Sequence, residues 1–252
     1  MTMRLMILIA LLLALPLRAE TIVSGMSETR VSIGATFDGK SILIYGAAAR
    51  EEKPPSWPRL QVIVTVQGPV QPIVVRKKER VAGIWVNRGW VAYDSAPSFY
   101  AVMTTGALGD ILSVDEDIRY NISIPREVGA VRLGASSGLA TDYLDALQRI
   151  RGGNGSYRQA DEVLFLQQSL FRTEVALPAN LIEGDYSVRI FLTRGGTVVD
   201  VHWSQITVRK EGLERFLFRL AQDQPLIYGL IALLMAALAG GGASELFRRL
   251  RL

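Results

Sequence analysis

The chain has 252 residues, of which 28 are Lys or Arg, 24 are Asp or Glu, one is His and none is Cys. The lack of cysteine excludes disulfide scaffolds, thiolate metal sites and cysteine nucleophiles, and one histidine cannot supply a multi-histidine metal site. The net charge of +4 arises at the two ends, because residues 20–224 carry 23 basic and 23 acidic side chains. We therefore predict no metal, no cofactor and no nucleic-acid partner.

The first 19 residues are predicted to be a signal peptide. Arg4 precedes an uncharged run from Leu5 to Leu17, and Ala19 offers a small residue at the cleavage position. This run reaches about 20 Å as a helix, which is short of the roughly 30 Å of a bilayer core. An uncleaved anchor is the alternative, because Arg18 stands beside the cleavage position.

Short β-branched runs separated by turn residues dominate residues 20–210. Such regular strands favour a β-sandwich over a parallel α/β sheet. Alternation over 31–37, followed by Asp38-Gly39, predicts a hairpin into a strand over 41–45. Further strands are expected over residues 60–66, 73–76, 81–87, 91–93, 98–104 and 120–124.

A helical excursion is predicted within this domain over about residues 139–168. Apolar residues recur at helical spacing from Thr141 to Arg151, and the glycine-rich run 152–155 ends that helix. A second short helix is expected from Gln159 to Leu166.

The last part of the domain predicts an immunoglobulin-like β-sandwich. A strand over 171–177 precedes Leu181-x-x-Gly-Asp-Tyr186, which resembles the tyrosine corner of such sandwiches. Gly195-Gly196 then predicts a two-residue hairpin between strands 187–193 and 198–208. This pattern concerns fold and implies no chemistry.

The C-terminal region predicts one membrane span. Residues 211–223 fit an amphipathic juxtamembrane helix, and residues 224–244 form an uncharged stretch of 21 residues, about 31 Å of helix. Three arginines in residues 245–252 favour a cytoplasmic tail, which places the preceding domain in the periplasm. A buried core helix is the alternative.

Small residues follow one face of the predicted span at four-residue intervals. Such a face allows close helix packing in lipid, with a partner helix or a second copy of the chain. A lone anchor is an equal alternative. The positions are Ala232, Ala236, Gly240 and Ser244.

Residues 76–80 (RKKER) carry a net charge of +3, and two tryptophans follow them. Because arginine and tryptophan concentrate at protein interfaces, we predict an interaction surface here for anionic headgroups, an acidic partner or an anionic ligand. The alternatives are a charged edge strand and, for the aromatic residues, core positions. The predicted surface comprises Arg76, Lys77, Lys78, Arg80, Trp85 and Trp90.

Catalytic chemistry has weak support. Asp200, His202 and Ser204 share one face of a predicted strand, but no nucleophile-elbow pattern surrounds the serine. The acidic run 115–117 lacks the spacing of a calcium loop, and the run 152–155 lacks the Lys-Ser/Thr of a phosphate loop. We predict no catalytic residues and treat these segments as solvent-facing.

The sequence has distinctive stretches at Arg76–Asn87, Pro97–Val102, Leu170–Thr173, Leu177–Asn180 and Gly184–Tyr186, and in the final span that contains Gly229. Together these stretches resemble the Alph_Pro_TM family of alphaproteobacterial transmembrane proteins. The resemblance implies an exported domain with a C-terminal anchor in a Gram-negative inner membrane. Members are often encoded near a permease that resembles sulfite exporters, which implies a transport partner but transfers no site residues.

The leading hypothesis is a single-pass inner-membrane protein that serves, without catalysis, as an interaction or accessory module for an envelope transporter or membrane complex. Its partners would be the lipid bilayer, a permease or other membrane protein, and a second copy through the span. The alternatives are a periplasmic sensor for a small anion and, with less support, a membrane-tethered hydrolase.

Overall fold

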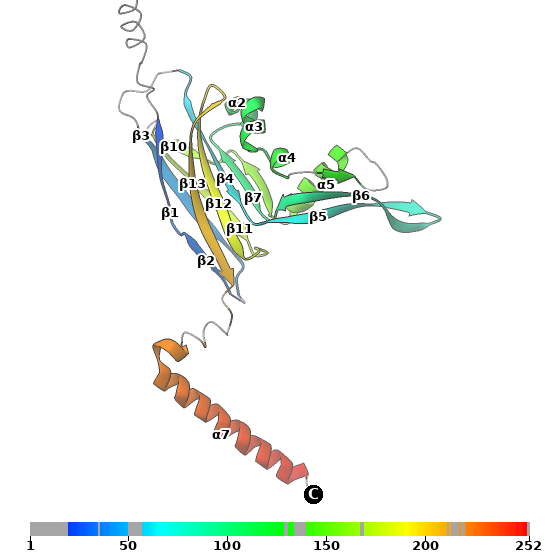
Figure 1. Cartoon of the computed structure of the whole chain (residues 1–252), viewed down its shortest axis with the longest axis vertical. Coiled ribbons are helices and arrows are strands. Elements are labelled where there is room, and N and C mark those ends of the chain that lie inside the picture. Colours follow the sequence, from blue (N-terminus) through cyan, green and yellow to red (C-terminus); the bar gives the residue numbers. More distant parts are fainter. Residues whose placement is uncertain are drawn as a thin grey trace, which may run out of the picture. The chain divides into compact units, whose positions relative to one another are not determined.

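The computed structural model describes residues 20–34, 36–49, 57–128, 131–133, 140–166, 169–210, 212, 217 and 220–250. The chain forms two compact units, residues 1–31 with 38–208 and residues 32–37 with 209–252. The first unit is mainly β, and the second contains the C-terminal helix (Figure 1). The predicted signal peptide, residues 1–19, lies outside the described residues.

One sheet of the first unit, sheet A, is antiparallel and has one buried face. Strand β11 alternates strictly, so that Phe171, Thr173, Val175 and Leu177 are buried and the residues between them are exposed. This is the period of two expected for a sheet that is packed on one side only. Its strand order is β1 (Thr21–Met26), β3 (Gly39–Ala49), β11 (Leu170–Pro178) and β10 (Leu164–Leu166).

The largest sheet, sheet B, is buried on both faces at its centre. The middle strands β4 and β12 bury nearly every side chain, which requires a covering layer on each side. On one side β7 contacts β11 of sheet A. The strand order is β2 (Arg30–Ile33), β13 (Thr197–Lys210), β12 (Gly184–Arg194), β4 (Leu60–Gln67), β7 (Tyr100–Thr104) and β9 (Tyr157–Ala160).

A third, smaller sheet contains a long hairpin. Strands β5 (Val70–Val81) and β6 (Ile84–Pro97) are antiparallel, and β8 (Val131–Leu133) pairs with residues 91–93 of β6. The two-residue turn Ala82-Gly83 has φ values of 49° and 89°, as a twisted two-residue hairpin turn requires. Figure 1 shows this hairpin extending away from the other strands of the unit.

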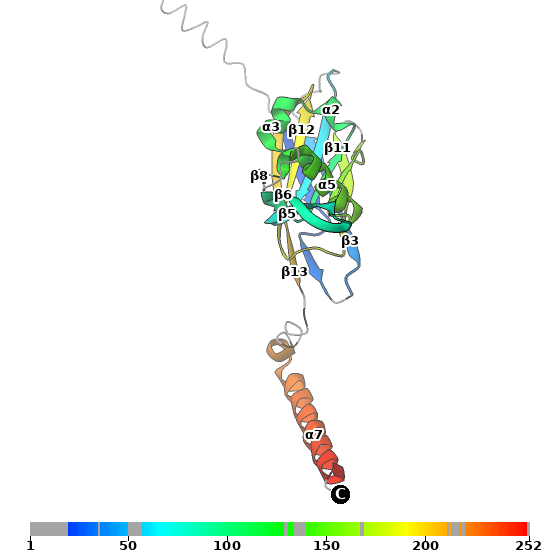
Figure 2. The same cartoon turned by 90° about the vertical axis from the view of Figure 1, so that its right-hand side faces the viewer.

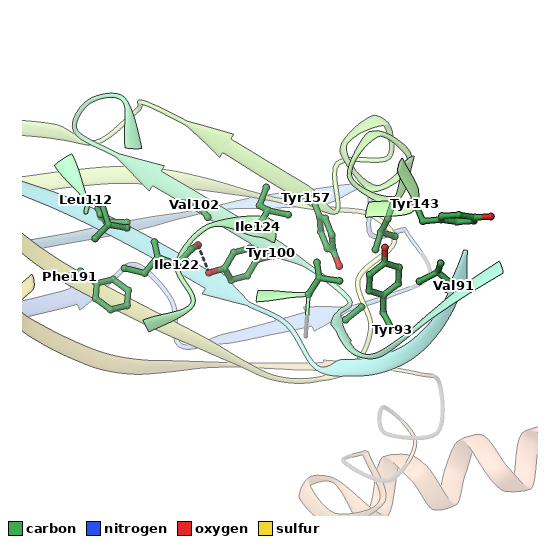
Figure 3. Close-up of a cluster of buried hydrophobic side chains, with 14 of the residues drawn as sticks. Val91, Tyr93, Tyr100, Val102, Leu112, Ile122, Ile124, Tyr143, Tyr157 and Phe191 are labelled. Carbon is green, nitrogen blue, oxygen red and sulfur yellow. Dashed lines mark hydrogen bonds between the residues drawn. The ribbon is translucent and has the colours of Figure 1, made fainter. Parts of the chain in front are cut away.

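Four helices lie on the same side of sheet B as the hairpin (Figure 2). They are α2 (Leu108–Ile111), α3 (Val114–Tyr120), α4 (Ile124–Glu127) and α5 (Ala140–Gly153). Together with β4, β6, β7, β9 and β12 they enclose a cluster of buried apolar side chains (Figure 3). The cluster includes Tyr93, Tyr100, Ile122, Tyr143, Tyr157 and Phe191.

Several predicted elements are confirmed. The strands expected over 60–66, 171–177 and 198–208 lie within β4, β11 and β13, and the turn at Gly195-Gly196 joins β12 to β13. Helix α5 covers the predicted 141–151 segment. The hydroxyl of Tyr186 donates to the carbonyl of Ile182 at 2.8 Å, which is the bond that a tyrosine corner requires.

Other predicted elements are wrong. Strand β3 pairs with β1 and β11, and β2 lies beside β13, so the expected hairpin between residues 31–37 and 41–45 does not form. Residues 120–124 join helices α3 and α4 instead of forming a strand, and the expected helix over 159–166 is replaced by parts of β9 and β10. Alternation reports which face of a strand is buried but not which strand lies beside it.

The second unit contains helix α7 (Pro225–Leu250). Its segment Pro225–Ala243 is long and apolar enough to cross a bilayer and is wholly unburied within the unit, in agreement with the predicted span. The helix continues through residues 245–250 of the predicted tail. Most of the predicted juxtamembrane segment 211–223 lies outside the described residues, although residues 220–223 are helical.

Candidate functional site

The predicted basic and aromatic residues meet on the β5–β6 hairpin. Backbone register places Arg76 opposite Trp90 and Arg80 opposite Trp85, and Lys78 lies between them opposite Asn87. Residues two apart on a strand share a face. The structure thus brings five of the six predicted residues onto one face, here called the basic-aromatic ladder: Arg76, Lys78, Arg80, Trp85 and Trp90.

Lys77 lies on the opposite face of the same hairpin. The register shifts between Lys77, which pairs with Gly89, and Lys78, which pairs with Asn87. The extra residue is therefore on β6, and β5 keeps its regular alternation through the basic run. Such a bulge increases the local twist of the hairpin.

Both tryptophans of the ladder are exposed. Trp85 exposes 67% of its surface and Trp90 39%, while the neighbouring Ile84 exposes 65%. The core positions expected as an alternative for the aromatic residues are occupied by Tyr93, Phe99 and Tyr100, which are buried. Large aromatic side chains left in solvent beside arginine are typical of binding surfaces.

The base of the hairpin is packed firmly against the rest of the unit. Val91 and Tyr93 are fully buried, with Ile73 and Val75 packed on the same cluster, and α5 contacts β5. The Tyr157 hydroxyl donates to the carbonyl of Pro97 at 2.9 Å, which fixes the end of β6. The buried base therefore holds in place the hairpin that bears the basic-aromatic ladder.

A buried polar network holds the helices to sheet B beneath this region. Arg189 on β12 forms an ion pair with Glu127 on α4 at 3.2 Å. Its guanidinium also donates to the carbonyls of Tyr120 and Asn121, at 2.8 and 3.2 Å, and to the Thr65 hydroxyl at 3.2 Å. One arginine thus satisfies acceptors from three separate segments.

The same network includes Tyr100 and Gln67. The Tyr100 hydroxyl accepts a hydrogen bond from Arg189 at 3.1 Å and donates to the carbonyl of Ile122 at 2.8 Å. The amide of Gln67 donates to Glu127. Because each polar group that we name here has a partner, the network stabilises the fold and offers no empty ligand position.

Burial alters the acidity of the network. It raises the pKa of Glu127 above its usual range, although the adjacent Arg189 cation acts in the opposite direction. Burial likewise raises the pKa of Tyr100 well above that of a free phenol. Sequence reasoning missed Arg189 and Glu127, and the available signal was one arginine inside the otherwise apolar strand 187–193.

The Asp200, His202 and Ser204 side chains lie on one face of β13. The Asp200 carboxylate, however, binds a backbone group of another strand. Its carboxylate accepts the backbone N–H of Ile22 at 2.8 Å, so that it ties β13 to β1. Cross-strand pairing places His202 opposite Ile190, which is buried. We expected this face of the strand to be exposed to solvent. That expectation is wrong for His202, which is half-buried on the same face of sheet B as Ile190.

The acidic run 115–117 belongs to helix α3 and not to a solvated loop. Asp117 accepts hydrogen bonds from the backbone N–H groups of Ile122 and Ser123, at 3.2 and 2.7 Å. Glu116 accepts from the backbone N–H of Val198 at 3.2 Å. These carboxylates stabilise the turn after α3 and the start of β13. The described residues contain no group of three or more His, Cys, Asp or Glu side chains that could hold a metal ion.

The small residues of the predicted span recur along α7 at four-residue intervals. Ala232, Ala236 and Gly240 lie in the apolar segment, and Ser244 follows in the same helix. Their spacing places them along one helix face.

A family model described as putative transmembrane protein (Alph_Pro_TM) matches residues 21–249. No curated protein matches the chain. The match covers both the first, mainly β unit, from here on called the β unit, and helix α7.

Proposed function

The chain belongs to the Alph_Pro_TM family of putative transmembrane proteins, and from that premise we propose a non-enzymatic interaction module for an envelope transporter or another membrane complex. In this proposal the protein crosses the bacterial inner membrane once, through α7. The arginines after the span favour a cytoplasmic C-terminus, and in this proposal the β unit faces the periplasm after removal of a signal peptide.

The observation that carries this proposal is the basic-aromatic ladder. Three cationic side chains and two exposed tryptophans lie on one face of a hairpin whose base is buried. Such a surface suits a partner that presents carboxylates between apolar side chains, because arginine pairs with carboxylate and tryptophan buries apolar area. We propose that a permease or other membrane protein supplies this surface.

We also propose that the β unit is an immunoglobulin-like sandwich with a large insertion. In such sandwiches the strands A, B, E and D form one sheet, and G, F and C form the other. The order β1-β3-β11-β10 matches A-B-E-D, and β13-β12-β4 matches G-F-C. The hairpin and the helices then lie between strands C and D of the sandwich, and the tyrosine corner opens strand F.

A sensor for a small anion is less well supported than an interaction module. The cationic residues of the ladder are spread along an exposed strand, whereas an anion site brings several donors to one point. Sulfite, sulfate or phosphate added to the full chain in detergent should leave the melting temperature unchanged. A rise in melting temperature that saturates with anion concentration would favour the sensor.

The test of the interaction module is partner capture from the native membrane. A photo-reactive residue at Asn87 on the ladder should cross-link the tagged protein to a membrane protein partner. Arg76→Glu with Arg80→Glu should abolish this cross-link and leave the melting temperature unchanged. The matched control is Arg30→Glu with Arg59→Glu, which makes the same charge change at exposed positions away from the hairpin. Equal cross-linking by both double variants would overturn the proposal.

A further inference from the structure

The outer face of sheet A carries exposed large apolar or aromatic residues on all four of its strands. This face is the side opposite the buried one, where a sheet normally carries polar residues. Five large residues on it expose between 46% and 62% of their surface: Val23, Tyr45, Leu164, Leu166 and Leu170.

Backbone register arranges these residues in two neighbouring rows that cross the sheet from β1 to β10. The first row is wholly apolar, and the second contains one charge. The first row is Val23, Ala47, Leu170 and Leu166, and the second is Gly25, Tyr45, Arg172 and Leu164. A continuous exposed apolar patch of this kind marks an interaction surface.

We propose that this face is an interface between two copies of the chain. The two rows are self-complementary about a twofold axis that runs parallel to the strands between β3 and β11. That axis places β3 over β11 of the partner subunit and β1 over β10. Ala47 then meets the partner subunit's Leu170, so that a small side chain faces a large one.

The second row pairs its one cation with an aromatic residue of the other copy. The same axis sets the Arg172 guanidinium against the ring of the partner subunit's Tyr45, a favourable cation–π arrangement. It also sets Leu164 over the partner subunit's Gly25, where the ring of the partner subunit's Tyr45 lies and offers an apolar contact. The one charged residue in the two rows therefore has an aromatic partner in the dimer.

The direction of the axis agrees with a chain that continues into a membrane span. A twofold axis parallel to the strands leaves the strands of both copies pointing the same way. Strand β13 runs roughly alongside the strands of sheet A (Figure 1), so its C-terminal ends emerge on the same side in both copies. Two chains anchored in one bilayer need that arrangement.

The size of the patch predicts a dimer that depends on the membrane. Four strands at about 4.8 Å spacing, over the roughly 14 Å of strand length that two rows occupy, give roughly 250 Å² per copy. The total of roughly 500 Å² lies well below that of stable soluble dimers. Confinement of both chains to one bilayer raises their effective concentration, which allows a small interface to associate.

The absence of cysteine from the sequence allows a selective test in the native membrane. Leu170→Cys should give a covalent dimer of twice the chain mass with a short bis-maleimide, because the two copies of this position lie beside the axis. Gln205→Cys, which is exposed on sheet B, should give at least fivefold less. Adding Arg172→Glu to Leu170→Cys should reduce the dimer by at least fivefold.

Two further variants separate this interface from the other surfaces. Arg76→Glu with Arg80→Glu on the hairpin should leave the Leu170→Cys dimer intact, so that failure of the hairpin proposal and of this one are distinguishable. The interface is overturned if Leu170→Cys gives no dimer, gives a product with a different protein, or dimerises no better than Gln205→Cys. It is also overturned if Gly240→Leu in α7 abolishes the dimer while Arg172→Glu has no effect, because the span alone would then hold the two chains.

Discussion

The guanidinium of Arg189 and the carboxylate of Glu127 lie 3.2 Å apart, with only 8% and 12% of their side chains exposed. This pair joins the centre of sheet B to helix α4. Desolvation of two charges is unfavourable, so the pair persists because the guanidinium also donates to the carbonyls that follow α3. Removing one member leaves the other buried without its opposite charge.

Arg189→Met should therefore destabilise the β unit by about 3–5 kcal/mol. The variant keeps the side-chain length but removes the cation beside the Glu127 carboxylate, which then keeps only the Gln67 amide as a donor. It also removes the guanidinium donor from two backbone carbonyls. Urea denaturation followed by tryptophan fluorescence measures the change. Arg158→Met is the control, because Arg158 pairs with Glu162 at the surface, where both side chains are more than 40% exposed, and should cost less than about 1 kcal/mol. Similar losses in the two variants would contradict the structural role of the network.

Tyr157 should make the stability of the β unit sensitive to alkaline pH. Burial raises the pKa of Tyr157 from 10.0 to about 12, against the opposing attraction of Arg151. The folded state thus holds the phenol proton more tightly than the unfolded chain does. This stabilisation is complete below about pH 10 and is lost as the pH rises toward 12, by roughly 2–3 kcal/mol in full.

The measurement is the urea midpoint at pH 8 and at pH 11 for the wild type and for Tyr157→Phe. The variant loses the hydrogen bond to Pro97 and should be less stable than the wild type at pH 8. Its midpoint should fall less between the two pH values than the wild-type midpoint does. An equal fall in both proteins would show that other groups cause the alkaline loss.

Tyr186→Phe should destabilise the β unit by about 0.5–1.5 kcal/mol. The change removes the bond to the Ile182 carbonyl and keeps the ring, which is almost fully buried against Phe99. Tyr45→Phe, at an exposed position, should change the unfolding free energy by less than about 0.5 kcal/mol. No difference between these variants in thermal unfolding would argue against a stabilising tyrosine corner.

Trp85→Ala should leave the stability of the β unit nearly unchanged, within about 0.5 kcal/mol, because the side chain is mainly in solvent. Tyr93→Ala, eight residues further along the same strand and fully buried, should cost about 3–5 kcal/mol. Differential scanning calorimetry compares the two. A large loss for Trp85→Ala would mean that this tryptophan is structural and would weaken its assignment to the ladder.

The sequence by itself determined the elements whose burial pattern is local. Short β-branched runs located β4, β11 and β13, helical spacing located α5, and the uncharged run located the apolar segment of α7. In each case the residues that share a face are near neighbours in sequence, so that the pattern of burial is written along the chain. The paired glycines at 195–196 fixed a hairpin for the same reason.

The tertiary structure alone decided which strands pair and which aromatic residues are buried. Strand β3 pairs with β1, which is nearby in sequence, and with β11, which lies more than a hundred residues further along the chain. Nothing in residues 31–45 encodes a partner as distant as β11. Trp85 is exposed and Tyr93 buried because they lie on opposite faces of the hairpin, and the covering layer packs on the Tyr93 face at the base. Likewise, Arg189 is tolerated in an apolar strand because acceptors over 60 residues away fold back to meet it. The chemistry of a side chain determines whether it needs apolar neighbours or hydrogen-bond partners. Only the long-range packing of the chain decides which residues become those neighbours and partners.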